Sequence, residues 1–106
     1  MLDVKDVNGK KVVYLKGEIN AQTGQQMKNE VLKLLESTDT VILSFKGVVY
    51  MNSSGLREII DLYKQCNKNK KNLRICDLSN DLKEMFSFTG LDKVFKIFAT
   101  ENDALR

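Results

Sequence analysis

Residues 40–56 of this 106-residue chain read TVILSFKGVVYMNSSGL, and they place a strand, a loop and a helix in direct succession. The first part, Thr40–Phe45, is a nearly continuous apolar run, which is typical of a central, parallel strand covered on both faces. We interpret Lys46–Asn52 as the loop that leaves this strand. Ser53-Ser54-Gly55 then opens a helix that we expect to end near Asn67.

The residues before this stretch predict a hairpin followed by a helix. Asn8-Gly9 favours a type I′ turn between a first short strand and a second strand around Val12–Leu15. The helix is expected over about Ala21–Glu36, where either Asn20 or Thr23 caps its first turn. Its apolar stripe is formed by Met27, Val31, Leu34 and Leu35.

The residues after the second helix continue the alternation of strands and helices. The expected elements are the strand Leu73–Cys76, a helix capped by Ser79 or Asn80, the strand Val94–Phe98 and a short helix Glu101–Leu105 capped by Thr100. We assign Phe86, Phe88, Phe95 and Phe98 to the core. Tyr50 and Met51 are either exposed contacts for a partner or core residues, and the core is favoured because apolar residues beside a helix start are commonly buried. The predicted fold class is α/β, in one domain over residues 1–106. A mixed, mostly parallel sheet of about five strands carries about four helices in the order β-β-α-β-α-β-α-β-α.

Composition excludes several classes of protein. Hydrophobic residues make up 42% and charged residues 29%, which is the balance of a soluble globular domain. The net charge of +3 is too small to indicate nucleic-acid binding. No apolar run approaches the ~20 residues that span a bilayer, and the first residues do not form a secretory signal. We therefore expect a cytoplasmic protein with no nucleic-acid partner and no membrane insertion.

The residue types also limit the possible chemistry. The chain has no histidine, which excludes Ser-His or Cys-His catalysis and histidine-ligated metal sites. Cys66 and Cys76 lack CxxC spacing and are interpreted as two reduced thiols. A nucleotide hydrolase is disfavoured because the chain has no phosphate-binding P-loop motif. We expect no enzymatic activity, no cofactor and no metal.

The start of the helix at Ser53 is the most informative candidate site. Unpaired backbone N–H groups and the helix dipole favour an anion there, and a phosphate on Ser53 would add about 1.5–2 negative charges. Alternatively, Ser53 or Ser54 simply caps the helix, and Gly55 lets helix and sheet approach closely. The chain pattern alone favours the cap, because serine-capped helices are common.

Several motifs, taken in order, resemble the STAS domain of the bacterial anti-sigma-factor antagonist family. Gly17–Asn20 resembles that family's Gly-Glu-Leu-Asp. Val41–Ser44 followed by Val49–Leu56 resembles its central strand and its Met-Asp-Ser-Ser-Gly-Leu signature. Thr89–Leu91 followed by Phe95 resembles its Thr-Gly-Leu segment. The similarity covers nearly the whole chain, and the order of the motifs makes it specific.

The resemblance implies a SpoIIAA-like fold and a phosphorylation switch with Ser53 as the phosphoacceptor. The unphosphorylated domain would bind an anti-sigma factor that is also an ATP-dependent serine kinase, and so release a sigma factor. Phosphorylation would weaken the complex, and a metal-dependent serine phosphatase would reset it. The implied partner-binding residues are Asn20, Thr23, Asn52, Ser54, Gly55 and Leu56.

Two positions depart from the family pattern. Asn20 and Asn52 stand where the family has aspartate, so each keeps a polar side chain that can cap a helix but loses a charge. If the kinase reads those charges, its recognition of this chain is weakened; if they serve only capping, asparagine suffices. The alternative function is therefore a STAS interaction subunit of a sensory or lipid-transport complex that is not phosphorylated.

Overall fold

The central strand, β3, is longer than the sequence predicts. In the computed structural model, which describes residues 2–106, β3 spans Thr40–Met51. The loop expected over residues 46–52 is therefore wrong as far as Met51. The physical reason is that β2 (Lys10–Ile19) stays paired in parallel with β3 up to the pair formed by Ile19 and Met51. Two shifts of register interrupt this pairing and let the two-stranded ribbon bend.

The remaining elements follow the predicted order. They are β1 (Asp3–Val7), α1 (Ala21–Leu34), α2 (Ser53–Lys68), β4 (Asn72–Cys76), α3 (Asn80–Phe88), a 3-10 turn (Leu91–Lys93), β5 (Lys96–Phe98) and α4 (Glu101–Leu105). The five-stranded sheet has the order β1-β2-β3-β4-β5, antiparallel between β1 and β2 and parallel elsewhere. Within residues 2–106, the predicted α/β class, five strands and four α-helices are confirmed.

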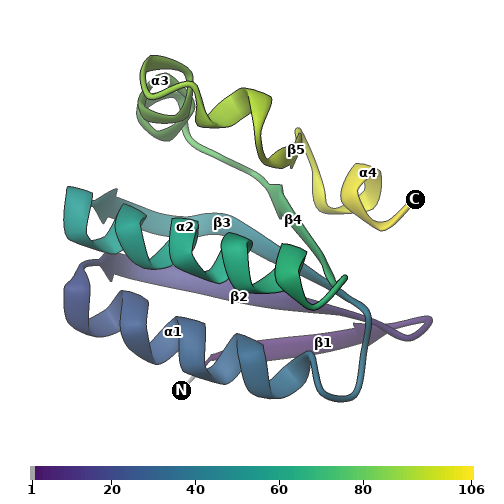
Figure 1. Cartoon of the computed structure of the whole chain (residues 1–106). Coiled ribbons are helices and arrows are strands. Elements are labelled where there is room, and N and C mark those ends of the chain that lie inside the picture. Colours follow the sequence, from purple (N-terminus) through teal and green to yellow (C-terminus); the bar gives the residue numbers. More distant parts are fainter. Residues whose placement is uncertain (1) are drawn as a thin grey trace.

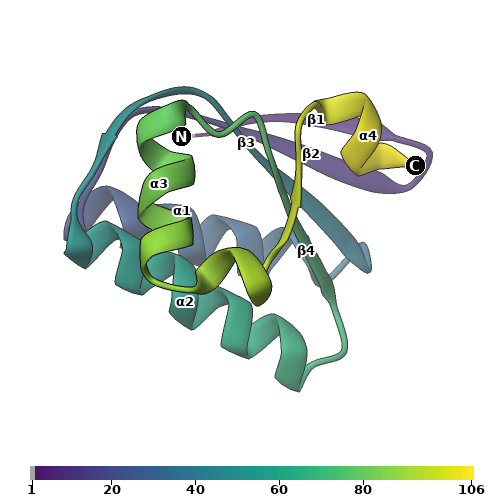
Figure 2. The ribbon, with the colours of Figure 1, turned by 90° about the horizontal axis from the view of Figure 1, so that it is seen from above.

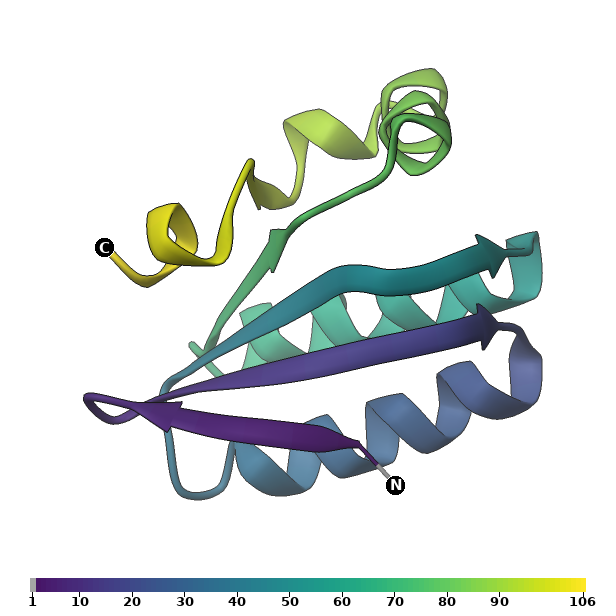
Figure 3. The same cartoon turned by 180° about the vertical axis from the view of Figure 1, so that it is seen from behind.

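The helices cover the two faces of the sheet unequally. α1 and α2 lie side by side on one face (Figure 1), and the view from above shows α3 near the end of the sheet where α2 begins (Figure 2). From behind, β1, β2 and β3 lie in front of α1 and α2 (Figure 3). On the face of the sheet opposite α1 and α2, a smaller apolar cluster joins Val12, Ile42 and Cys76 to Ala104 of α4. This second cluster explains why Thr40–Phe45 is buried along its whole length.

Two of the predicted core assignments are wrong. Phe86 and Phe95 are buried and stack edge to face, with ring centroids 5.6 Å apart, but Phe88 is 94% exposed. Tyr50 is 55% exposed, whereas its neighbour Met51 is buried. Each error has the same cause, since alternate residues of a strand, and residues two apart on a helix, face different directions.

Candidate functional site

The helix that carries Ser53 is capped by an asparagine. Asn52 is the N-cap of α2, and its Oδ1 accepts a hydrogen bond from the backbone N–H of Gly55 at 2.8 Å. The interpretation of Ser53 or Ser54 as the cap is therefore wrong. Ser53 is the first helical residue and is exposed, and its hydroxyl makes no hydrogen bond to the part of the chain that the structure describes. The hydroxyl is thus free to face a partner.

A second capped helix start lies at Asn20. The Asn20 Oδ1 accepts hydrogen bonds from the backbone N–H groups of Gln22 and Thr23, both at 3.0 Å. The Thr23 hydroxyl in turn accepts the backbone N–H of Asn20 at 2.9 Å, which completes a capping box. The same hydroxyl donates to the carbonyl of Glu18 at 2.8 Å, so the end of β2 is held to the first turn of α1. Asn20 and Thr23, offered as alternative caps by the sequence, both contribute.

The fold brings these two helix starts together. The backbone N–H of Asn52 donates to the carbonyl of Ile19 at 3.1 Å. A Cβ atom on Gly55 would lie 2.6 Å from the carbonyl carbon of Ile19 and 3.0 Å from the backbone nitrogen of Asn20. Real Cβ atoms do not approach backbone so closely, so this position requires glycine. The expectation that Gly55 permits close approach of helix and sheet is confirmed.

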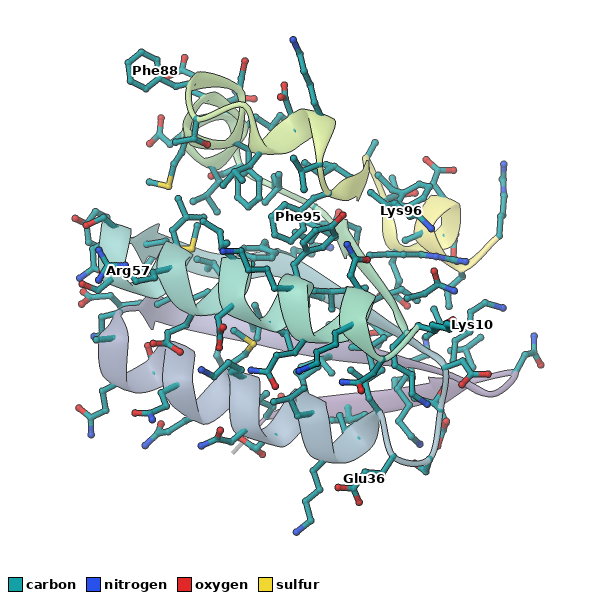
Figure 4. The ribbon with its side chains drawn as sticks, viewed as in Figure 1. Lys10, Glu36, Arg57, Phe88, Phe95 and Lys96 are labelled. Carbon is teal, nitrogen blue, oxygen red and sulfur yellow. The ribbon has the colours of Figure 1, made fainter. Side chains whose placement is uncertain are left out.

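The predicted site residues divide into an exposed and a buried group. Ser53 and Thr23 are exposed, and Asn20, Asn52 and Ser54 are partly exposed. Gly55 and Leu56 are buried, and Leu56 belongs to the main core. The two buried residues therefore set the position of α2, while the other five form the surface. We call this surface, formed by Asn20, Thr23, Asn52, Ser53 and Ser54, the Ser53 surface. Arg57 projects outward at the same end of the molecule (Figure 4).

An ion-pair cluster that sequence reasoning missed fixes α1 against α2. The Nζ of Lys28 lies 2.9 Å from a carboxylate oxygen of Glu58 and 2.8 Å from one of Asp61. Hydrogen bonds to Asp61 and then Glu58 raise the pKa of Lys28, and the Lys28 hydrogen bond, followed by that of Gln65, lowers the pKa of Asp61. The sequence carries no signal for this contact, because the partners are about 30 residues apart and each resembles an ordinary surface charge.

The electrostatics of the Ser53 surface suit an added anion. The first turns of α1 and α2 both point backbone N–H groups toward this end of the fold, and their dipoles carry partial positive charge there. Neither helix has an acidic residue in its first turn.

Among residues 2–106, no cluster of three or more metal-ligating side chains could hold a metal ion. No helix in the same residues has the length and apolar character needed to cross a bilayer.

The comparisons with known proteins agree with this architecture. The family model described as "STAS domain" matches residues 1–104, and the chain therefore belongs to the STAS domain family. The chain is 26% identical over 106 residues to the anti-sigma F factor antagonist of Paenibacillus polymyxa, covering 98% of this chain and 91% of that protein. It is 29% identical over 98 residues to the anti-sigma-B factor antagonist of Bacillus subtilis, covering 92% and 90%.

The fold also matches a solved structure of a phosphorylated protein. The Bacillus cell fate determinant SpoIIAA in its phosphorylated form superposes with a TM-score of 0.74 at 20% identity, over 99% of this chain and 96% of that chain. Such a likeness confirms the SpoIIAA-like fold expected from the sequence motifs.

Proposed function

We infer that this chain is an anti-sigma-factor antagonist whose binding is switched by phosphorylation of Ser53. The observation that carries the proposal is the state of the Ser53 side chain, which is exposed and not used by the helix cap that Asn52 provides. The names of the two relatives above support the function, and the phosphorylated form of SpoIIAA supports the mode of regulation.

The switch follows from what a phosphate does to a docking surface. In the unphosphorylated state, the Ser53 surface is polar but carries no formal charge, so a partner can bury it at modest cost. A phosphate adds about 1.5–2 negative charges. Burying these charges against a partner costs desolvation free energy, and acidic residues of the partner would repel them. A coupling of about 1–3 kcal/mol between phosphate and partner changes the affinity roughly 5–150-fold, which is enough to release the partner.

Asparagine in place of aspartate at positions 20 and 52 is compatible with a phosphorylation switch at Ser53. Asn20 and Asn52 both act as N-caps, so the helix starts that hold the Ser53 surface keep their hydrogen bonds without a carboxylate. Their side chains are neutral, and a carboxylate borders the surface at Glu18, whose Oε1 accepts a hydrogen bond from the Asn20 Nδ2 at 3.1 Å. In this proposal the capping role, rather than the charge, is what positions Ser53 for the kinase.

The proposed partners are proteins. The domain sequesters an anti-sigma factor that is also a serine kinase, and a metal-dependent serine phosphatase removes the phosphate from Ser53. The domain contributes the Ser53 hydroxyl that accepts the phosphate and a binding surface, and the kinase and phosphatase catalyse both reactions, so the domain is a regulatory module in the cytoplasm and not an enzyme. Nucleic acid and membrane are not among its proposed partners.

The test uses the cognate anti-sigma factor kinase, defined as the kinase that copurifies with the chain and transfers phosphate to it from ATP. We expect one phosphate per chain, at Ser53 by mass spectrometry, none on Ser53→Ala, and normal phosphorylation of the control Ser37→Ala, which replaces an exposed serine just after α1. Ser53→Asp should bind the kinase at least fivefold more weakly than Ser53→Ala. Equal affinities of these two variants would favour the non-switching interaction subunit, and a phosphate on Ser54 would overturn the assignment of the site.

A further inference from the structure

The end of α3 carries an aromatic side chain that the fold does not use. Phe88 is 94% exposed, while Phe86, two residues earlier on the same helix, is completely buried. Residues two apart on a helix point in nearly opposite directions, so Phe88 is turned away from the core. An aromatic ring buries 150–250 Å² when it is covered, which makes one left in water at a helix end a candidate contact for another molecule.

The surroundings of Phe88 define the chemistry of its contact. An open depression of about 500 Å³ is lined by Asp81, Glu84, Met85, Ser87 and Phe88, and we call it the α3 groove. Its apolar part is the ring of Phe88 and the partly buried side chain of Met85. Asp81 and Glu84 are exposed, so the rim is acidic although the chain as a whole has a net charge of +3. Such a rim attracts a segment that combines an apolar side chain with lysine or arginine.

The α3 groove lies at the same end of the molecule as the Ser53 surface. In three views, α3 sits at the end of the sheet where β3 stops and α2 begins (Figures 1, 2 and 3). Phe88 and Arg57 project from this end, whereas Glu36 lies well away from Phe88 (Figure 4). One partner protein of ordinary size, with an interface of about 800 Å² on each side, can therefore meet both features.

We propose that the α3 groove is a second docking point for the anti-sigma factor that recognises Ser53. The occupant is a segment of that partner with an apolar side chain, which packs on Phe88 and Met85, and with basic residues that face Asp81 and Glu84. This assignment rests on the proposed function and adds to it a recognition element that does not touch the phosphoacceptor. Removing it should weaken docking without disturbing phosphate transfer in the assembled complex.

The experiment measures binding and phosphorylation with the purified cognate kinase. Phe88→Ala should weaken the kinase complex about 10–30-fold by titration calorimetry, as loss of an aromatic hot spot does. It should also raise KM for phosphorylation of Ser53 while leaving kcat nearly unchanged. Glu84→Lys should weaken binding several-fold, and the effect should shrink at high salt. The matched controls are Val4→Ala, an exposed apolar residue on β1, and Glu36→Lys, an exposed glutamate just after α1. Both should bind as the wild type does.

The results that would contradict the proposal separate the α3 groove, the charge and identity of its occupant, and the proposed function. If the wild type binds and is phosphorylated at Ser53 but Phe88→Ala binds equally well, the α3 groove is not a docking point and the proposed function stands. If Glu84→Lys binds unchanged or more tightly, the basic character of the occupant is wrong. If the wild type self-associates and Phe88→Ala makes it monomeric, the occupant is a second copy of the chain. If the wild type neither binds nor is phosphorylated, the proposed function itself fails.

Discussion

Replacing Gly55 with alanine tests how the two helix starts are held together. The new methyl carbon would lie 2.6 Å from the carbonyl carbon of Ile19, and an ordinary contact begins at 3.4 Å. The atoms in the way are backbone of β2 and of the α1 cap, so no flexible side chain can swing aside. The carbonyl oxygen of Ile19 lies closer to the new methyl group than the carbonyl carbon does, so the start of α2 must move by more than the 0.8 Å that the carbon alone requires. This movement stretches the hydrogen bond from Asn52 to Ile19 beyond a useful length.

The expected change in the free energy of unfolding combines two destabilising terms with one stabilising term. Overpacking of this kind costs about 1–3 kcal/mol, and the weakened hydrogen bond costs a further 0.5–1.5 kcal/mol, roughly. Alanine is a better helix former than glycine by about 0.5–1 kcal/mol, which offsets part of the loss. We expect Gly55→Ala to lower the free energy of unfolding by about 2 kcal/mol, within a range of roughly 0.5–4 kcal/mol.

Urea unfolding followed by circular dichroism measures this loss, with Ser54→Ala as the matched control. Ser54 is the neighbouring residue and is only partly buried, so its replacement should change the free energy of unfolding by less than about 0.5 kcal/mol. Gly55→Ala should also be phosphorylated more slowly than Ser54→Ala, because the displaced helix carries Ser53 with it. A Gly55→Ala variant as stable as the control would refute the close approach of α2 to Ile19.

Two further predictions concern the helix cap and the buried thiols. Asn52→Ala should lower the free energy of unfolding by about 1 kcal/mol, whereas Asn52→Asp keeps the cap acceptor and should be at least as stable as the wild type at pH 7; urea titrations compare them. Burial raises the pKa of Cys66 to about 11 and that of Cys76 to about 12, so the folded state keeps these protons while the unfolded chain loses them above pH 9. The free energy of unfolding under reducing conditions should therefore fall as the pH rises, by about 3 kcal/mol between pH 7 and pH 10. Cys66→Ala should lose only about half as much, and a flat profile in the wild type would contradict the burial of both thiols.

The order of the elements was predictable because each one has a local signal. The apolar run Thr40–Phe45 and the stripes on the two long helices mark a strand covered on both faces and two amphipathic helices. The turn at Asn8-Gly9 also has a backbone requirement that these residue types indicate directly, and both residues have positive φ.

Features that depend on residues far apart in the sequence, such as the length of β3 and the ion pairs of Lys28, have no local signal and were not predictable. The extension of β3 to Met51 requires β2 to run alongside it, and nothing in the local sequence reports that pairing. The contact of Lys28 with Glu58 and Asp61 joins two helices whose relative position only the fold defines.

The candidate site stays a prediction, and the structure adds where each of its residues lies. Its seven residues were found through the family motifs, and the structure adds the division of labour among them. Asn52 caps, Gly55 and Leu56 place the helix, and Ser53 keeps a free hydroxyl. A serine at a helix start is ambiguous in sequence, since the same residue type serves as cap or as exposed group depending on which residue begins the helix.

The most direct test of the account compares the affinity of the cognate kinase for the chain before and after stoichiometric phosphorylation, with the modified residue identified by mass spectrometry. We expect a single phosphate on Ser53 and an affinity at least fivefold lower in the phosphorylated chain. A phosphate on another residue, or an affinity that does not change when Ser53 is phosphorylated, would contradict it.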